Sequence, residues 1–182
     1  MQTFPTLRTE RLVLRQLQTQ DSEHIFSYFS TDEVTKYYDL DTFTDPAQAE
    51  SLIISWQERY NNQQGIRWAI SFQEEDRIIG TCGFHNWSKK HRKAEVGYEL
   101  SLEYWGHGMM TEALNKIISY GTEEMGLNRI GAVIFPDNAA SRRLLEKTGF
   151  CEEGILKGYY YKNNRFIDAL MFSKLHQTNL PD

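Results

Sequence analysis

The sequence predicts an α/β protein with a central, twisted sheet that is mixed but mostly antiparallel and is flanked by helices. Segments with apolar residues at every second position alternate along the chain with segments whose apolar residues follow helical spacing. Some consecutive strand-like segments are separated by short polar turns, which is typical of antiparallel hairpins. The length of 182 residues, with a hydrophobic fraction of 40%, predicts one domain over residues 1–182.

Each expected element follows from its local pattern. Pro46, after Asp45, is typical of a first helical turn, whereas Gly126 and Gly149 are typical of residues that end helices. The expected elements, in order, are a strand at 7–15, a helix at 21–29, an aromatic segment at 34–38, a helix from 45 to 60, strands at 67–72, 77–84 and 95–100, a helix at 110–125, a strand at 129–134, a helix at 139–148, and strands at 151–156 and 166–173.

Composition excludes several classes of function. A formal net charge of −5 argues against nonspecific nucleic-acid binding. Because no apolar run approaches the roughly 18 residues of a membrane span and the first residues do not form a secretory signal, we expect no membrane partner and a cytoplasmic location. Cys82 and Cys151 form no C-x-x-C pair, and we expect both to be reduced core residues. His85 and His107 lack zinc-site spacing, so we expect no metal.

A glycine-containing turn at residues 105–109 lies between the strand at 95–100 and the helix that follows. Gly106 and Gly108 lack a Cβ, so the turn can reach positive φ and its amides can approach a bound group closely. The first amides of the helix are unpaired and carry the positive end of its dipole. This arrangement predicts an anion site, best suited to phosphate.

Three phosphate-binding patterns compete for this turn. The nucleotide P-loop requires a lysine before Ser or Thr, and Met110 precedes Thr111 here. The dinucleotide fingerprint G-x-G-x-x-G matches at Gly106 and Gly108 but has Thr111 in the third glycine place, and it remains an alternative. The third pattern fits best. Residues 95–114 resemble the acyl-CoA-binding core of the GNAT superfamily, although Glu103 stands where its Q/R-x-x-G-x-G/A loop has Gln or Arg.

The resemblance extends along nearly the whole chain to the RimJ/RimL-like branch, whose best-known members acetylate ribosomal-protein N-termini. Residues 7–15 resemble its first strand, residues 138–150 its second CoA-contacting helix, and residues 159–168 its closing hairpin. The resemblance implies the GNAT fold and acetyl-CoA as co-substrate. The implied cofactor-binding residues are Leu100, Trp105, Gly106, His107, Gly108, Met109, Met110, Thr111, Asn138, Ser141, Arg143 and Lys147.

Individual roles follow from that resemblance. Asn138 would cap its helix and hydrogen-bond the pantetheine arm. Independently of the resemblance, the anionic CoA needs local positive charge in a net acidic protein. The candidates are Lys116, Arg142, Arg143 and Lys147, and the solubility of a helix surface explains each of them equally well. A backbone N–H near Leu100 would meet the oxyanion, at a point where family strands separate.

Acetyl transfer to an amine also needs a base, because an ordinary amine is mostly ammonium at pH 7. Glu95 matches the catalytic glutamate of histone-acetylating relatives, and Glu99 lies on the same strand face. Many family members place a tyrosine general acid where this chain has Leu145. Ser141, one helical turn earlier, is therefore the candidate donor to the leaving sulfur.

These observations predict an acetyl-CoA-dependent N-acetyltransferase that acts by direct attack in a ternary complex. The expected acceptor is a protein N-terminal α-amine of the ribosomal-protein-alanine type. A small-molecule or antibiotic amine is an alternative, as is a non-catalytic acyl-CoA-binding module. The sequence does not fix the oligomeric state, and a homodimer is compatible with it.

Overall fold

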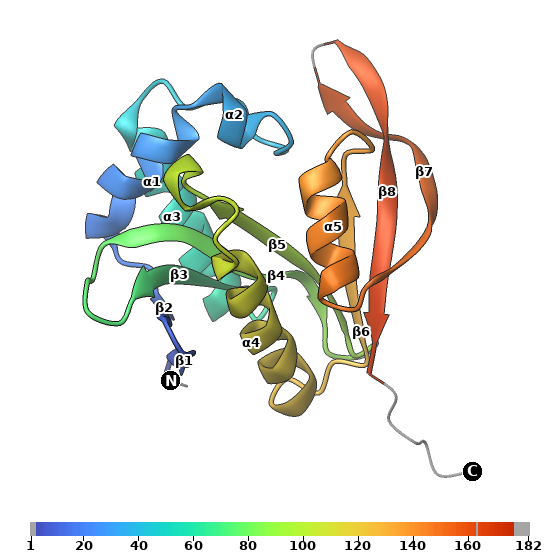
Figure 1. Cartoon of the computed structure of the whole chain (residues 1–182), viewed down its shortest axis with the longest axis horizontal. Helices are drawn as coiled ribbons and strands as arrows, with labels where there is room; N and C mark the ends of the chain where they lie inside the picture. Colours follow the sequence, from blue (N-terminus) through green and yellow to red (C-terminus); the bar gives the residue numbers. More distant parts are fainter. Residues whose placement is uncertain (1–2, 163, 177–182) are drawn as a thin grey trace.

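The computed structural model describes residues 3–162 and 164–176 and contains one eight-stranded sheet with the order β1-β2-β3-β4-β5-β6-β8-β7 (Figure 1). Every neighbouring pair is antiparallel except β5 and β6. The strands are β1 Leu7–Arg8, β2 Leu12–Gln16, β3 Ile66–Phe72, β4 Ile78–Ser88, β5 Lys93–Leu100, β6 Arg129–Ile134, β7 Cys151–Lys162 and β8 Arg165–Leu175. The predicted mixed, mostly antiparallel sheet is confirmed. A doubly wound dinucleotide-binding fold is excluded, because its sheet would be mostly parallel.

Helices cover both faces of this sheet. On one face α4 and α5 pack over a core that includes Trp68, Phe84 and Leu114, whereas α1 and α3 enclose a second cluster around Phe29 and Ile53 on the other (Figure 1). The helices are α1 Ser22–Phe29, α2 Asp32–Thr35, α3 Pro46–Asn61, α4 Met109–Glu123 and α5 Ala139–Lys147, with 3-10 turns at η1 Thr19–Asp21 and η2 Leu102–Tyr104.

Local signals account for several helix ends. The Asp45 side chain accepts a hydrogen bond from the backbone N–H of Ala47, and Gln48 completes a capping box, so α3 begins where Pro46 predicts it. Gly126 and Gly149 have φ of 66° and 84°, the left-handed conformation that ends helices.

Some expectations were wrong in detail. The strand expected at 7–15 is a tight hairpin that turns at residues 9–12. The backbone N–H and the hydroxyl of Thr9 both donate hydrogen bonds to the Leu12 carbonyl, and the hydroxyl accepts one from the Leu12 N–H. The last two strands are longer than expected, since they continue through a register irregularity between Leu156 and Tyr160. Cys82 is buried as expected, but Cys151 is exposed because it lies on β7, the outermost strand of the sheet.

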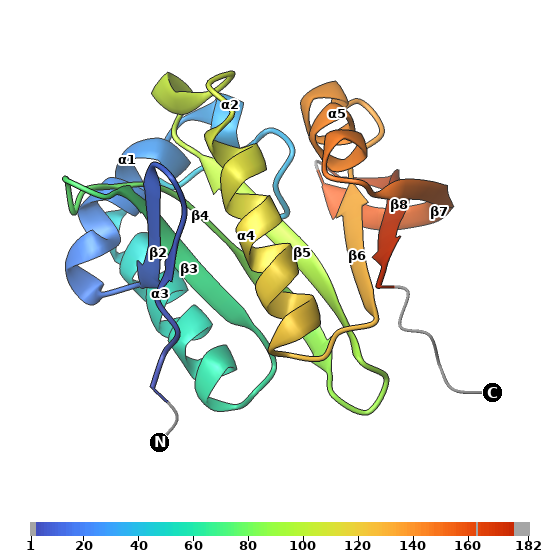
Figure 2. The ribbon, with the colours of Figure 1, turned by 60° about the horizontal axis from the view of Figure 1, so that its bottom comes forward.

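The pairing of β5 with β6 ends early. Only Lys93, Ala94 and Glu95 have partners on β6, and Glu95 pairs with Gly131. Beyond that pair the strands diverge, and Figure 2 shows the separation widening toward the start of α4 and α5. Residues 96–100 therefore have no strand partner on the β6 side, and the sheet is open there.

Candidate active site

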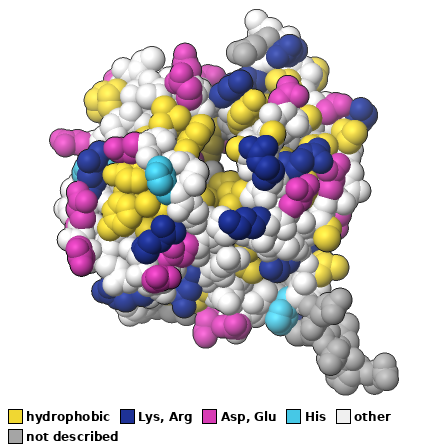
Figure 3. Space-filling view, viewed as in Figure 1, with side chains coloured by type: hydrophobic (Ala, Val, Ile, Leu, Met, Phe, Trp, Pro, Cys, Tyr) yellow, Lys and Arg dark blue, Asp and Glu magenta, His cyan; other side chains and the backbone are white. Residues whose placement is uncertain are grey.

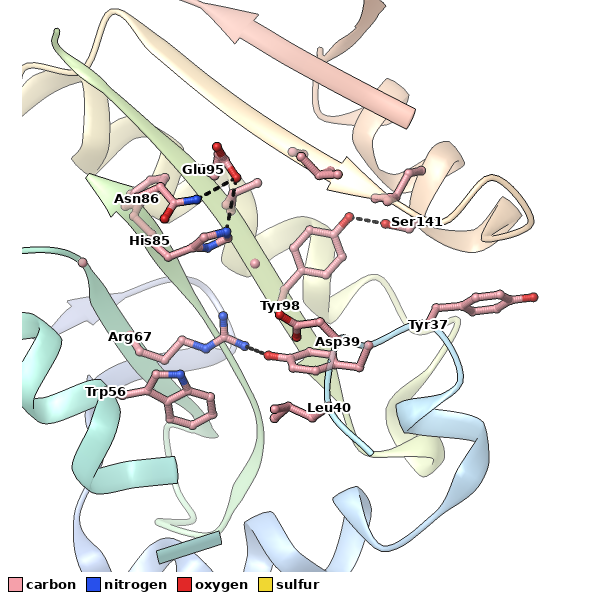
Figure 4. Close-up of a pocket in the computed structure, with 18 of the residues that line it drawn as sticks. Tyr37, Asp39, Leu40, Trp56, Arg67, His85, Asn86, Glu95, Tyr98 and Ser141 are labelled. Atoms are coloured by element: carbon pink, nitrogen blue, oxygen red, sulfur yellow. Dashed lines mark hydrogen bonds and ion pairs between the residues drawn. The ribbon is translucent and has the colours of Figure 1, made fainter. Parts of the chain in front are cut away.

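A cavity of about 450 Å³ occupies the opening between β5 and β6. This volume lies in the range of small-molecule sites. Figure 4 shows its labelled residues converging from β3, β4, β5, α3, α5 and the loop after α2. Figure 3, viewed as in Figure 1, shows a hollow with apolar side chains at its base. The cavity is lined by residues from both faces of the sheet, so a ligand on one face can reach a group on the other.

Glu95 lies at the last paired position of β5, where the opening begins, and it lines the cavity. Its Oε2 accepts a hydrogen bond from Asn86 Nδ2 at 3.1 Å and lies 3.5 Å from His85 Nε2 (Figure 4). Oε1 has no hydrogen-bond partner among the described residues. The His85 imidazole lowers the pKa of Glu95, against the opposing effect of its partial burial. The carboxylate is therefore held ionised, and its Oε1 keeps its capacity to accept a hydrogen bond.

The glycine opposite Glu95 keeps room for this side chain. A Cβ at Gly131 would lie 3.2 Å from Glu95 Cγ, which is tighter than an ordinary contact. At Gly97 a Cβ would lie 3.0 Å from Arg67 Nη1. Both glycines thus leave space at the point where the strands separate.

Ser141 and Tyr98 form a pair of hydroxyls on the opposite side of the cavity. Tyr98 Oη and Ser141 Oγ are 2.5 Å apart, and both residues line the cavity (Figure 4). Burial raises the pKa of Tyr98 to about 12, and the bond to Ser141 partly opposes that shift. Asn138 caps α5 as expected, because its Oδ1 accepts from the Ser141 backbone N–H at 3.0 Å. The cap fixes the turn that carries the Ser141 hydroxyl.

Glu99 lies deeper than Glu95, and its carboxylate is fully engaged. It accepts hydrogen bonds from Arg67 Nη2, Thr81 Oγ1, Tyr28 Oη and Tyr38 Oη. The Arg67 and Glu99 side chains are 8% and 4% exposed, so this is a buried ion pair. Glu99 does not line the cavity, whereas Arg67 and Tyr38 do. The structure thus separates the two glutamates that share one face of β5.

The glycine turn has the geometry expected of an anion site. Gly106 and Gly108 have φ of 80° and 78°, and Gly108 is the N-cap of α4 without a side-chain cap. The first amides of α4 are therefore available to a ligand. Trp105 supports the turn, because its indole Nε1 donates to the Leu100 carbonyl at 2.9 Å. The Met110 side chain is buried in the core, so that residue can offer only its backbone.

The remaining predicted cofactor residues are distributed around this turn and on α5. His107 is exposed, and Met109 and Thr111 are half-buried in the first turn of α4. Arg143 and Lys147 are exposed one helical turn apart on α5. Figure 3 shows Lys and Arg side chains gathered over α5, beside the hollow. Of the predicted residues, Glu95, Asn138 and Ser141 line the cavity, whereas the turn at 105–111 lies outside its lining.

The outer wall of the cavity joins distant parts of the chain. Residues 37–40, after α2, and Tyr159 and Tyr160 of β7 all line the cavity. Lys162 ties these parts together, since its Nζ donates to the carbonyls of Thr35 at 3.0 Å and Tyr38 at 2.9 Å. The loop and the hairpin are therefore held as one wall.

Sequence reasoning missed Arg67, Tyr98 and Lys162. An arginine inside the otherwise apolar strand Ile66–Phe72 was a usable signal, because a buried charge needs a partner. Tyr98 alternates with Gly97 and Glu99 and so lies on the other face of β5, and nothing local indicates that its hydroxyl meets α5. The contacts of Lys162 span more than 120 positions and have no local signature.

Within residues 3–162 and 164–176, no group of three or more His, Cys, Asp or Glu side chains is arranged to hold a metal ion. No helix in that part of the chain has the length and apolar character needed to cross a bilayer.

Comparison with known proteins identifies the family. A family model described as an acetyltransferase (GNAT) domain matches residues 11–151. Uncharacterized N-acetyltransferase YoaA of Bacillus subtilis (strain 168) is 48% identical over 170 residues, which cover 93% of this chain and 96% of YoaA. The ribosomal protein uS5-alanine N-acetyltransferase of Escherichia coli (strain K12) is 27% identical over 175 residues, covering 91% of this chain and 88% of that protein.

A solved structure agrees with these sequence relatives. The ribosomal-protein-S5-alanine acetyltransferase from Vibrio fischeri has a TM-score of 0.83 and 26% identity, covering 97% of this chain and 100% of that one. The resemblance to the RimJ/RimL-like branch is thus confirmed by relatives that include ribosomal-protein acetyltransferases. The chain belongs to the GNAT family of acetyltransferases and is an N-acetyltransferase that takes its acetyl group from acetyl-CoA.

Proposed function

We propose that this N-acetyltransferase acetylates the α-amine of protein N-termini by direct attack in a ternary complex. The observation that carries the proposal is the position of two polar groups on opposite sides of one opening. Glu95 shares its strand face with Glu99, which contacts α1, whereas the hydroxyl of Tyr98 meets Ser141 of α5. The acceptor would approach from the first face and the acetyl donor from the second.

Glu95 is proposed to accept the proton from the acceptor amine, through its free Oε1 or through a bridging water. A carboxylate whose pKa is lowered is a weak base, so it suits an amine that needs little help. An α-amine with a pKa near 7.8 is about 30% neutral at pH 7.4, but a lysine-like amine is only about 0.1% neutral. An α-amine therefore needs less help from a base than a lysine side chain does.

Ser141 and Tyr98 are proposed to stabilise the sulfur as it leaves. A thiol has a pKa near 8.5, whereas that of Tyr98 is raised to about 12, so full proton transfer from this tyrosine to a thiolate is unfavourable. The hydroxyls would act as hydrogen-bond donors that strengthen as charge develops on sulfur. Leu145 is fully buried in the core and cannot contribute.

The turn at 106–111 is proposed to bind the phosphates of acetyl-CoA. Positive φ at Gly108 and the uncapped start of α4 fit a diphosphate, since backbone amides can approach it without a Cβ between. Asn138 lines the cavity, where it can meet the pantetheine arm, and the unpaired edge of β5 up to Leu100 offers backbone groups to the thioester.

Glu99 is proposed to hold Arg67 and the aromatic side chains beside it on the acceptor side of the cavity, instead of acting as a base. Its four hydrogen-bond donors leave no oxygen free toward the cavity, and its ion pair holds Arg67 under the ring of Trp56, 4.9 Å from the centroid. Arg67 also donates to Tyr38 Oη at 3.1 Å. Both aromatic residues line the acceptor side of the cavity.

The test compares acceptors at a fixed concentration of acetyl-CoA. Thiol release should be fastest with peptides that have a free N-terminal alanine or serine. It should fall to background with the same peptides blocked at the α-amine but carrying an internal lysine. Faster release with polyamines or aminoglycosides than with any peptide would overturn the N-terminal assignment in favour of a small-molecule acceptor.

A further inference from the structure

The anion site at the start of α4 has no cation of its own. Residues 101–115 contain no Lys or Arg but include the carboxylates Glu103 and Glu112. Glu112 lies in the first turn of α4, where it would repel a phosphate at the helix N-terminus. Glu103 lies 3.3 Å from Arg77, which it partly neutralises. A binding site for a diphosphate therefore needs positive charge from another part of the chain.

The N-terminal hairpin supplies that charge. Arg11 lies between β1 and β2, and its Nε donates to Glu112 Oε2 at 2.7 Å. Its backbone N–H and the Thr9 hydroxyl both donate to the other Glu112 oxygen, at 2.9 and 2.5 Å. The hairpin thus neutralises the carboxylate in the first turn of α4, although it is about 100 residues away in sequence.

Arg11 also reaches the glycine turn itself. Its Nη1 donates to the His107 carbonyl at 3.2 Å. This bond holds the peptide between His107 and Gly108 against the N-terminal hairpin. Nη2 lies 3.7 Å from the position that a Gly108 Cβ would occupy and has no partner among the described residues. The Arg11 side chain as a whole is 43% exposed.

We propose that Arg11 is a binding residue for the diphosphate of acetyl-CoA, which it contacts through Nη2 while its other guanidinium nitrogens hold the turn and Glu112. The inference rests on the proposed binding of acetyl-CoA phosphates at residues 106–111. It adds to that site a residue outside the turn and the helix. An arginine suits this role, because its fork can hold two acceptors and present a further donor to a phosphate.

The experiment compares the parent protein with Arg11→Gln. Calorimetry measures the binding of CoA and of 3′-dephospho-CoA, and steady-state kinetics measure kcat/KM with S-acetylpantetheine. A charged hydrogen bond to phosphate predicts that Arg11→Gln weakens CoA binding about 10- to 100-fold. The loss should be the same with 3′-dephospho-CoA, which keeps the diphosphate. With S-acetylpantetheine, which lacks every phosphate, the substitution should lower kcat/KM by less than about threefold. Arg8→Gln is the matched control, since the Arg8 side chain is exposed on β1 and has no hydrogen-bond or ion-pair partner among the described residues. The Arg8→Gln protein should bind CoA as the parent does.

Each contrary result has a distinct meaning. An equal loss with CoA and S-acetylpantetheine would make Arg11 a structural brace only, and a loss that disappears with dephospho-CoA would place it at the ribose phosphate. Either result overturns the proposal, as does unchanged CoA affinity. If Arg11→Gln does not fold, Arg11→Lys provides the same comparison with the charge retained, and an affinity for CoA equal to that of the parent would refute a role for the fork. Failure of the parent protein to prefer acetyl-CoA over S-acetylpantetheine would instead contradict the proposed phosphate site.

Discussion

Removing the Ser141 hydroxyl is the most direct test of the proposed transition-state contacts. Ser141→Ala should fold normally, because alanine is favourable in the first turn of α5 and the Asn138 cap uses the backbone of residue 141. The Tyr98 hydroxyl loses its partner at 2.5 Å, but it lines the cavity, where water can replace that bond. The expected cost in the free energy of unfolding is about 1 kcal/mol.

The kinetic cost should be larger than the structural one. A neutral hydroxyl that hydrogen-bonds a developing thiolate contributes on the order of 1–3 kcal/mol, which corresponds to roughly a 5- to 150-fold loss of rate. Because the bond strengthens in the transition state, the loss should appear in kcat more than in KM for acetyl-CoA. Tyr98→Phe should give a loss of similar size. The double variant should lose little more than the worse single variant, since the two hydroxyls act as a unit.

The assay is steady-state thiol release with a fixed acceptor peptide, accompanied by thermal unfolding of each variant. Ser119→Ala is the control, because that serine is exposed on α4 and its hydroxyl contacts only Glu123, at 3.4 Å, among the described residues. Full activity in a folded Ser141→Ala protein would refute the reasoning. Strictly additive losses in the double variant would show that Ser141 and Tyr98 act independently.

The remaining predictions concern Glu95, Glu99 and Lys162. Glu95→Gln should lower kcat/KM about 10²- to 10⁴-fold. The loss should shrink as pH rises from 6.5 to 9.5, because more of the amine is then neutral without a base. A pH-independent loss below tenfold would instead assign Glu95 a structural role. In the parent enzyme the lowered pKa keeps Glu95 ionised over that range, so the rise of kcat/KM with pH should follow the pKa of the acceptor peptide and move when a peptide of different pKa is used. Glu99→Gln should lower stability in urea unfolding by about 3–5 kcal/mol, because it leaves the Arg67 charge buried and unpaired; an unchanged midpoint with lost activity would instead indicate a chemical role. Lys162→Met should raise KM for the acceptor but not for acetyl-CoA, because it removes the hydrogen bonds that hold the loop after α2 against β7. Equal effects on both KM values would contradict the placement of the acceptor beside that loop.

Periodicity and turn chemistry predicted most of the fold. The order of strands and helices, the start of α3 at Pro46 and the left-handed Gly126 and Gly149 are local properties, because spacing, capping and φ depend on a few neighbouring residues. The sequence pattern did not distinguish the environments of Glu95 and Glu99. The glutamates of β5 look equivalent in sequence, since both lie two positions from Gly97 on one strand face, yet Glu99 is buried with Arg67 and Glu95 lines the cavity.

The sequence by itself determined the mixed sheet, the glycine turn that begins α4, and the presence of Glu95 and Ser141 as candidates for chemistry. Tertiary structure decided how these groups meet. The early end of the β5 and β6 pairing, the contact of Tyr98 with Ser141 and the arrival of Arg11 at the turn all join residues far apart in the chain. Such contacts depend on how separate elements pack and on where a sheet opens, and neither spacing nor composition encodes that geometry locally.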